Sequence, residues 1–372
     1  MESLFQTNNP KRHKIISDRF DTIQLKSSTD EFETASQEHL KKKLEILKDD
    51  IQSAIELEHS TIPPYLCALY SIKDGANDYA ANTIKSIVLE EMLHMIMAAN
   101  ILNAIGGSPA INTPDFIPEY PTKLPEITED FYVSLEKFSK SSLSTFLKIE
   151  KSAEHKPHGG HDYHSIGEFY ASIKRRLILL DAAIEGGIFT GNRALQITSE
   201  QYYGSGGKLV SVYCLADAIL AIDEIVGQGE GIDGEIEDPD HELFGEGIEY
   251  AHYFRFNEIY HEQKYRPRDS PQEPPTGRPI TVDWDAVYNM KENPKMADFP
   301  QSSEIWQKLY NFNKTYMALL NNIHDACNGN PQLLMQGIAL MYDLKYKALE
   351  LMKIPISEGS SITVGPSFEY VE

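Results

Sequence analysis

The sequence predicts an all-α protein built around a bundle of four helices. Four long stretches repeat their apolar residues at helical spacing, and a proline-rich segment separates the first two stretches from the last two. The stretches are residues 37–70, 80–105, 209–228 and 243–263. A long crossover of this kind is needed to join two helical hairpins in a bundle. Glutamate and histidine interrupt the apolar stripes in both halves.

The first hairpin has a clear end and one internal irregularity. Its second helix stops at Gly106 and Gly107, with Pro109 beyond, which is a usual helix stop. Pro63 and Pro64 lie inside the first helix. Because proline lacks an amide hydrogen and its ring meets the preceding turn, we expect a break or a kink there.

Insertions and a C-terminal extension enlarge this bundle. Helical spacing returns at 141–150 and 165–186, inside a long insertion. The expected organisation is an N-terminal arm over 1–36, the bundle over 37–265 with its insertion over 109–205, a connection rich in proline and glycine over 266–300, and a helical hairpin with a tail over 301–372, packed on the bundle.

The acidic composition limits the classes of partner. The chain of 372 residues has 56 acidic and 34 basic side chains, which gives a net charge of −22. Because binding to phosphate groups needs clusters of lysine and arginine, neither nucleic acid nor a membrane is expected as a partner. A small-molecule substrate is expected instead, and a homodimer is a candidate assembly.

Cysteine usage and the N-terminal sequence indicate the compartment. Cys67, Cys214 and Cys327 are odd in number, widely spaced and set in apolar helical stretches, as is typical of a reducing compartment. The N-terminus lacks the order of charged and then apolar residues that marks a signal peptide. No apolar run reaches membrane-spanning length. We therefore expect a cytoplasmic protein.

Polar residues inside the apolar stripes of the first hairpin predict a metal site. Glu91 and His94 are three positions apart, so they lie on one face of a helix and can share an ion. Burying them unpaired in that hydrophobic stripe would cost on the order of several kcal/mol. On the preceding helix, Glu58 lies on the apolar stripe and Glu56 on the polar face.

The fourth helix supplies a second acidic residue and histidine at the same spacing. Five such pairs occur where composition predicts about two by chance, so the apolar context must choose among them. Glu249 and His252 share a face with apolar residues, whereas Glu258 and His261 should face away.

Two carboxylates compete for the third helix. Glu230 falls on the apolar stripe, and Glu224 mirrors the position of Glu58 relative to the turn between the helices. A glutamate and a Glu-x-x-His from each half form the ligand set with which ferritin-like bundles hold two metal ions. Carboxylate and imidazole ligands suit iron best here, with manganese as the alternative.

Other residues are candidates for shaping a substrate pocket beside the metals. We assign this role to Tyr170 and to Glu168, although Glu168 could equally be a carboxylate favoured by the helix dipole. His155, His158, His161 and His164 have regular spacing, but the proline and glycines between them forbid a helix. We expect a loop over the mouth of the bundle, with adventitious metal binding as the alternative.

These motifs together resemble the ferritin-like domain of the iminophenyl-pyruvate dimer synthase family, the enzymes of violacein and indolocarbazole biosynthesis. The resemblance starts near residue 45 and rests on Leu57-Glu-His-Ser-Thr-Ile-Pro-Pro-Tyr65, on Leu89-Glu-Glu-Met-Leu-His94, and on residues 98–107, 165–170, 228–231, 252–256, 283–288 and 365–370. Those synthases are far longer, and Gly227 stands where their pattern has glutamate. The resemblance implies the fold and a metal site that includes Glu230.

The leading functional prediction is a non-haem di-iron oxidoreductase of secondary metabolism. Its substrate would be a small metabolite, with aromatic and amino-acid-derived compounds as candidates, and O₂ or peroxide would be the oxidant. One alternative is a ferroxidase or another iron-handling protein. The other is a structural or binding bundle without metal.

Overall fold

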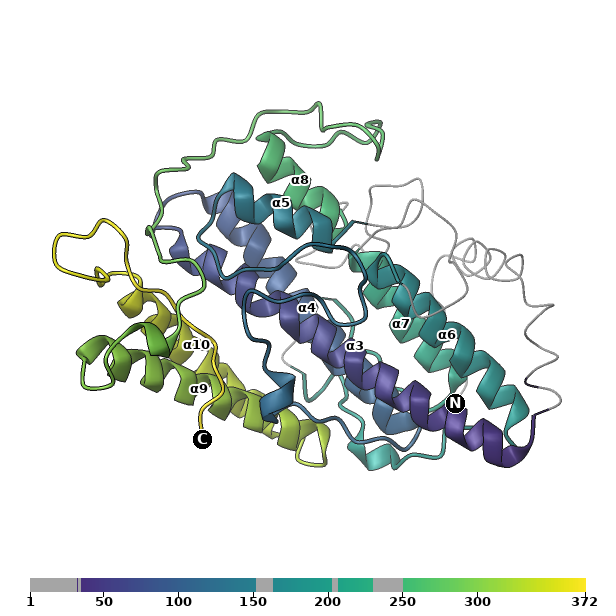
Figure 1. Cartoon of the computed structure of the whole chain (residues 1–372). Coiled ribbons are helices and arrows are strands. Elements are labelled where there is room, and N and C mark those ends of the chain that lie inside the picture. The colour runs from purple at the N-terminus through teal and green to yellow at the C-terminus, as the bar shows by residue number, and fades with distance from the viewer. Residues whose placement is uncertain (1–31, 33–34, 152–162, 203–206, 230–249) are drawn as a thin grey trace.

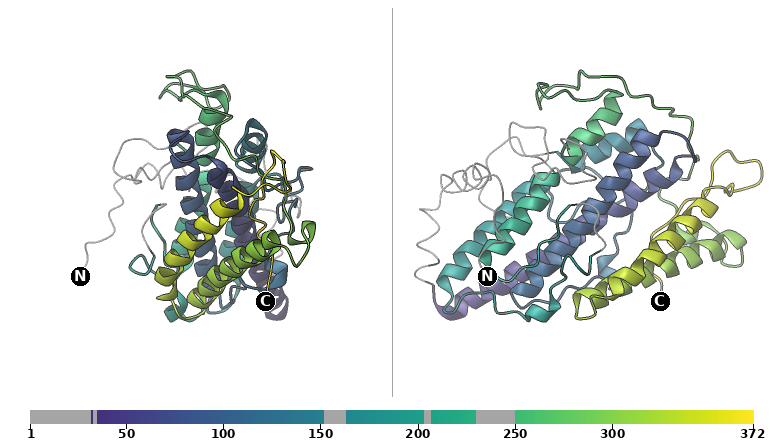
Figure 2. Two further views of the ribbon diagram at one scale, coloured as in Figure 1. Left: turned by 90° about the vertical axis from the view of Figure 1, so that its left-hand side faces the viewer. Right: turned by 180° about the vertical axis from the view of Figure 1, so that it is seen from behind.

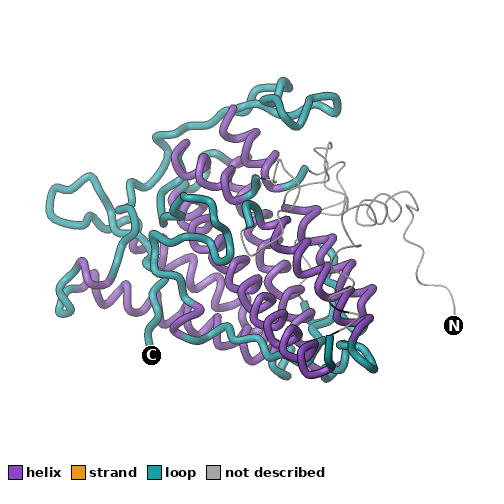
Figure 3. Tube along the Cα trace, turned by 45° about the vertical axis from the view of Figure 1, so that its right-hand side comes forward, coloured by secondary structure: helices purple, strands orange, loops and turns teal. Residues whose placement is uncertain are grey.

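The computed structural model describes residues 32, 35–151, 163–202, 207–229 and 250–372. Within these residues the regular structure consists of eight α-helices and three short 3-10 helices. Isolated bridges occur, but this part of the chain contains no strand, as Figure 3 shows. The predicted all-α fold is therefore confirmed.

Helices α3 (Gln37–Ser71) and α4 (Asp78–Ala104) form the long hairpin at the centre of the fold (Figure 1). Ser36 caps α3 by accepting a hydrogen bond from the His39 amide. At the end of α4, Gly107 N–H donates to Leu102 O at 2.9 Å and Gly106 N–H to Asn103 O at 3.1 Å. This is the Schellman motif, and Gly106 has the positive φ of 78° that it requires. The predicted stop of this helix is confirmed.

Of the break or kink expected at Pro63 and Pro64, the break does not occur, because α3 runs through both residues. Pro64 has no amide hydrogen for the carbonyl of Ser60, four residues earlier. The hydroxyl of Tyr120, from the crossover, donates to that carbonyl at 2.8 Å. A side chain from another segment thus replaces the donor that is missing at Pro64.

The other two sides of the bundle are each built from two shorter helices. Helices α6 (Ile166–Ala183) and α7 (Leu215–Gly229) pack on each other and on the hairpin at one end. Helices α5 (Lys140–Ile149) and α8 (His252–His261) do the same at the other end (Figures 1 and 2). In the described part of the chain, four shorter helices thus stand beside the long hairpin, two at each end.

The starts of two expected helices are corrected by the structure. The helix expected over 209–228 begins only at Leu215. Within the described residues, the helix predicted over 243–263 begins later than expected, because Tyr250 is not helical and Ala251 has a ψ of 159°. Helix α8 therefore begins only at His252. Residues 243–249 lie outside the described residues.

A C-terminal hairpin packs on the outer side of α3 and α4 (Figure 2). It consists of α9 (Glu304–Cys327) and α10 (Leu333–Leu351). The hydroxyl of Tyr316 in α9 lies 2.7 Å from His59 Nε2, and Asn103 Nδ2 donates to Cys327 O at 2.7 Å. The preceding connection contains only one short 3-10 helix, Met296–Asp298, among its regular elements.

The central position of α4 explains its high hydropathy. By length and composition this helix could cross a membrane, but 89% of its most apolar window is buried inside the protein. Neighbouring helices pack on it, so α4 has the character of a core helix of the bundle.

Replacing Tyr120 by Phe tests how α3 passes its prolines. The change leaves the buried carbonyl of Ser60 without a donor, so we expect the free energy of unfolding to fall by about 1–3 kcal/mol in urea denaturation. In a Pro64→Ala background the backbone amide returns, so Tyr120→Phe should cost less there. An equal loss in both backgrounds would contradict the role assigned to Tyr120.

Candidate metal centre

Five acidic and imidazole side chains meet inside the bundle. Glu58 comes from α3, Glu91 and His94 from α4, Glu150 from the residue that ends α5, and His252 from the first turn of α8. Each is at most 3% exposed. They form two groups whose ligand atoms lie within 4.8 Å of one another, namely Glu58 with Glu91 and His94, and Glu91 with Glu150 and His252. Glu91 belongs to both groups.

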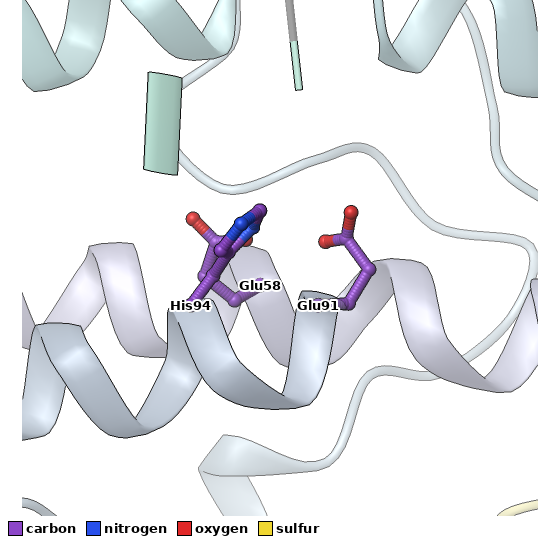
Figure 4. A group of neighbouring side chains, drawn as sticks. All are labelled: Glu58, Glu91 and His94. Carbon is purple, nitrogen blue, oxygen red and sulfur yellow. The ribbon is translucent and has the colours of Figure 1, made fainter. Parts of the chain in front are cut away.

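The hairpin positions the first group directly. Figure 4 shows Glu58 on one helix facing Glu91 and His94 on the other. Glu91 and His94 are one turn apart on α4, as their spacing predicts. The ring of His94 stacks at 5.6 Å between centroids on the ring of His252, which brings the two groups together.

Both imidazoles point the same nitrogen at the carboxylates. Nδ1 of His94 lies 3.6 Å from Glu58 Oε2, and Nδ1 of His252 lies 2.9 Å from Glu91 Oε1 and 3.4 Å from Glu150 Oε2. Nε2 of each ring faces away, toward an oxygen of Gln228 in one case and of Glu90 in the other. Since oxygen can only accept there, Nε2 carries the proton and Nδ1 is the nitrogen available to a metal.

One oxygen of each carboxylate in the centre is held by a hydroxyl group. Tyr170 donates to Glu58 Oε1 at 2.5 Å, and Tyr65 donates to Glu150 Oε1 at 2.5 Å. The hydroxyl of Thr61 lies 3.0 Å from Glu91 Oε2 and shares its hydrogen with the backbone carbonyl of Glu58 at 2.8 Å. In each case the oxygen that faces an imidazole is the other one. The hydroxyl groups therefore fix the orientation of the carboxylates and leave one oxygen of each directed inward.

The burial of three carboxylates close together raises the pKa values of groups in the centre. Burial and the charge of Glu150 raise the pKa of Glu91 to about 7. Burial lowers the pKa of His94, but the hydrogen bond and charge of Glu58 outweigh burial and raise it to about 9. The pKa of His252 is likewise raised well above its ordinary value, because Glu150 and Glu90 outweigh burial. Without a cation, protons must therefore compensate the negative charge.

This donor set fits metal ions. Nδ1 of His252 is buried and makes no hydrogen bond of good geometry, although it points into the carboxylates. Buried polar atoms are rarely left in this state without a partner such as an ion. Carboxylate oxygens and imidazole nitrogens are ligands that suit iron and manganese. Glu58, Glu91, His94, Glu150 and His252 are the residues that would hold two ions.

The structure brings together four of the six residues predicted as metal ligands: Glu58, Glu91, His94 and His252. Glu230 and Glu249 lie outside the described residues. Glu224 is buried and accepts a hydrogen bond from Gln228 at 3.4 Å, but it is in neither group.

Glu150 was missed by the sequence reasoning. It ends the stripe that begins with Leu143 and Phe146, at positions i, i+3 and i+7 of the expected helix over 141–150. An acidic residue on an apolar stripe is the same signal that identified Glu91. It was overlooked because no histidine follows it at helical spacing and because the helix lies in the insertion.

The remaining candidates lie around the centre or away from it. Tyr170 contacts Glu58. The carboxylate of Glu168 accepts a hydrogen bond from the His164 amide at 2.7 Å, while the Glu168 amide donates to the hydroxyl of Ser165, which caps α6. The side chain of His164 is 52% exposed and lies 3.6 Å from Glu129. His155, His158 and His161 lie outside the described residues.

Glu258 and His261 do not join the centre, as their helical phase predicted. Glu258 is buried, but Tyr79, Lys264 and the backbone of Tyr265 contact its carboxylate. His261 is exposed.

Comparisons with known proteins agree with this architecture. A family described as ferritin-like matches residues 51–261. Among solved structures, the chain is similar to a ferritin-like protein from Caulobacter vibrioides, with a TM-score of 0.57 and 22% sequence identity, over 87% of this chain and 97% of that one. At this identity the likeness shows the fold alone. No curated protein matches the chain. The finer resemblance to iminophenyl-pyruvate dimer synthases stays a prediction.

Replacing His252 or Glu150 by Ala should remove metal from the protein. Each change deletes a ligand and leaves buried carboxylates less compensated, so we expect bound iron or manganese to fall by at least about half and the thermal midpoint to fall with it. Metal analysis of protein purified without chelator measures this. His261→Ala, from the exposed end of the same helix, is the matched control and should retain metal. Loss of metal in this control alone would contradict the assignment.

The stabilising effect of metal should increase with pH. The folded-state pKa values of Glu91 and His94 lie above their ordinary values of 4.5 and 6.5, so their protons stabilise the metal-free fold at low pH. This contribution disappears as pH rises through about 7 for Glu91 and about 9 for His94. We expect the difference in thermal midpoint between Mn(II)-loaded and chelator-treated protein to be larger at about pH 8.5 than at about pH 6. A difference in thermal midpoint that does not change with pH would contradict the raised pKa values of Glu91 and His94.

Proposed function

The chain belongs to the ferritin-like family, and from this premise we propose that it is a non-haem di-metal oxidoreductase. Iron is the first choice of metal and manganese the second. The proposed substrate is a small aromatic or amino-acid-derived metabolite, oxidised with O₂ or peroxide in the cytoplasm. The observation that carries this proposal is the pair of buried ligand groups that share Glu91.

The metal ions would supply the oxidising power, since neither carboxylate nor imidazole exchanges electrons with O₂ under ordinary conditions. The residues of the chain supply position and shielding. Tyr65, Tyr170 and Thr61 orient the three carboxylates, so the ligands need little rearrangement when an ion binds. The burial of all five side chains keeps bulk water away from the ions.

An aromatic cluster makes the surroundings of Glu150 apolar, which would suit oxidation of an organic substrate at the proposed centre. Tyr65, Phe146 and Phe256 pack on one another, with ring centroids 4.5 to 5.2 Å apart. The hydroxyl of Tyr65 is the group that holds Glu150, so this cluster adjoins the carboxylate directly. The proposed class of substrate rests on the resemblance of the sequence to the synthases.

Iron handling is the second candidate function, and one observation weighs against it. The hairpin of α9 and α10 packs on the outer side of α3 and α4, where it enlarges the bundle well beyond a compact cage-forming subunit. A bundle without metal is disfavoured by the centre itself. Three carboxylates buried this closely repel one another unless cations or protons compensate them.

Oxygen uptake by protein loaded with Fe(II) distinguishes these functions. We expect about two irons per chain, a brief uptake of O₂ on mixing, and sustained uptake only when an organic substrate is present, for example an aromatic 2-imino acid generated by an amino-acid oxidase. The variant His252→Ala should show no sustained uptake, whereas His261→Ala should behave as the wild type.

A ferroxidase would instead keep consuming O₂ as more Fe(II) is added without any organic compound. Sustained uptake of that kind, with iron mineral held by a large assembly, would establish iron handling. Fewer than about one iron per chain would contradict both metal-dependent functions.

A further inference from the structure

The ligands that would surround the two metal positions are closely matched. Each position has its own glutamate and its own histidine, and Glu91 is shared. The glutamate that belongs to one position only also accepts a hydrogen bond of 2.5 Å from a tyrosine, Tyr170 for Glu58 and Tyr65 for Glu150. Among the described residues, the groups that would touch the ions therefore give little reason for the two positions to differ.

The groups behind the imidazoles are different. Nε2 of His94 lies 2.8 Å from the amide oxygen of Gln228, which is neutral. Nε2 of His252 lies 2.7 Å from Oε2 of Glu90, which is a carboxylate. Both partners are almost completely buried, Gln228 at 1% and Glu90 at 0% exposure. The imidazoles of the two positions thus have hydrogen-bond acceptors of different charge in similarly dry surroundings.

Arg255 keeps Glu90 in place. Its guanidinium donates to both oxygens of Glu90, one bond being 3.1 Å long, and to Ser86 Oγ at 3.1 Å. Arg255 lies one turn after His252 on α8, and Glu90 precedes Glu91 on α4. The pair Glu90–Arg255 therefore joins the two helices that carry the ligands of the second position, and it fixes the orientation of the His252 ring.

Hydrogen bonds to an ionised acceptor are about twice as strong as bonds between neutral groups. A carboxylate that accepts from the outer nitrogen of a ligand histidine also makes the inner nitrogen a stronger electron donor, and losing such a partner lowers metal affinity about 10–100-fold. We propose that Glu90, held by Arg255, makes the position of Glu91, Glu150 and His252 the tighter of the two, whereas Gln228 leaves the position of Glu58, Glu91 and His94 weaker. Glu90 and Gln228 are positioning residues in this proposal, which rests on the metal centre of the proposed function.

Titration of the full chain with Mn(II), after removal of metal by a chelator, tests whether the two positions differ in affinity. We expect two binding events per chain, with dissociation constants that differ about 10–100-fold. Calorimetry measures both events, and electron paramagnetic resonance measures the concentration of free Mn(II). His94→Ala should retain the tight event, and His252→Ala should retain only the weak one. Two events of equal affinity would overturn the inequality while leaving the di-metal centre intact. Binding of less than about one ion would overturn both proposals.

A charge-neutral double variant tests the cause. Glu90→Gln with Arg255→Gln removes the buried ion pair as a whole, so neither charge is left uncompensated, and an amide stands behind His252 as it does behind His94. We expect the tight event to weaken about 10–100-fold and the weak event to keep its affinity. The matched variant Gln228→Ala should weaken only the weak event.

Circular dichroism and thermal unfolding verify that both variants fold before titration. The proposed cause is overturned if the double variant leaves the tight event unchanged, or if it weakens the event that requires His94.

Discussion

The structure depends on the burial of three carboxylates in the interior of one helical bundle. Glu58, Glu91 and Glu150 could not stay there as bare charges, because desolvation and mutual repulsion would oppose folding. Each has one oxygen satisfied by a hydroxyl and the other directed at an imidazole. The hydroxyls come from α3 and α6, and the imidazoles from α4 and α8, so the polar network ties these four helices to one another.

The continuity of α3 is part of the same arrangement. Glu58 and Thr61 precede Pro63, and Tyr65 follows Pro64, yet all three side chains contact the centre. A break at the prolines would rotate Tyr65 away from Glu150. The hydrogen bond from Tyr120 to Ser60 therefore has an effect beyond its own strength, since it keeps the residues before and after the prolines in one helical register.

Sequence patterns predicted the parts of this protein that depend on neighbours along one helix. Glu91 and His94 were identified because their spacing and their place on an apolar stripe are local properties of α4. The patterns could not show that Tyr120 would supply the donor missing at Pro64, or that Glu150 would meet His252, since these contacts join segments 60 and 102 residues apart in the chain. Of the helix expected over 243–263, the described residues form α8 from His252 to His261, and apolar spacing alone did not show that Ala251 would precede the first helical residue.

The five residues of the centre are attached to the backbone in two different ways. Glu58, Glu91 and His94 lie in the middle of long helices, where intrahelical hydrogen bonds on both sides hold the main chain. Glu150 is the residue that closes α5, and His252 is the one that opens α8. At a helix terminus part of the main chain has no intrahelical hydrogen-bond partner. Three residues of the centre are thus held by the long central hairpin, whereas Glu150 and His252 depend on their side-chain partners, Tyr65 for Glu150 and Glu90 for His252, to keep their orientation.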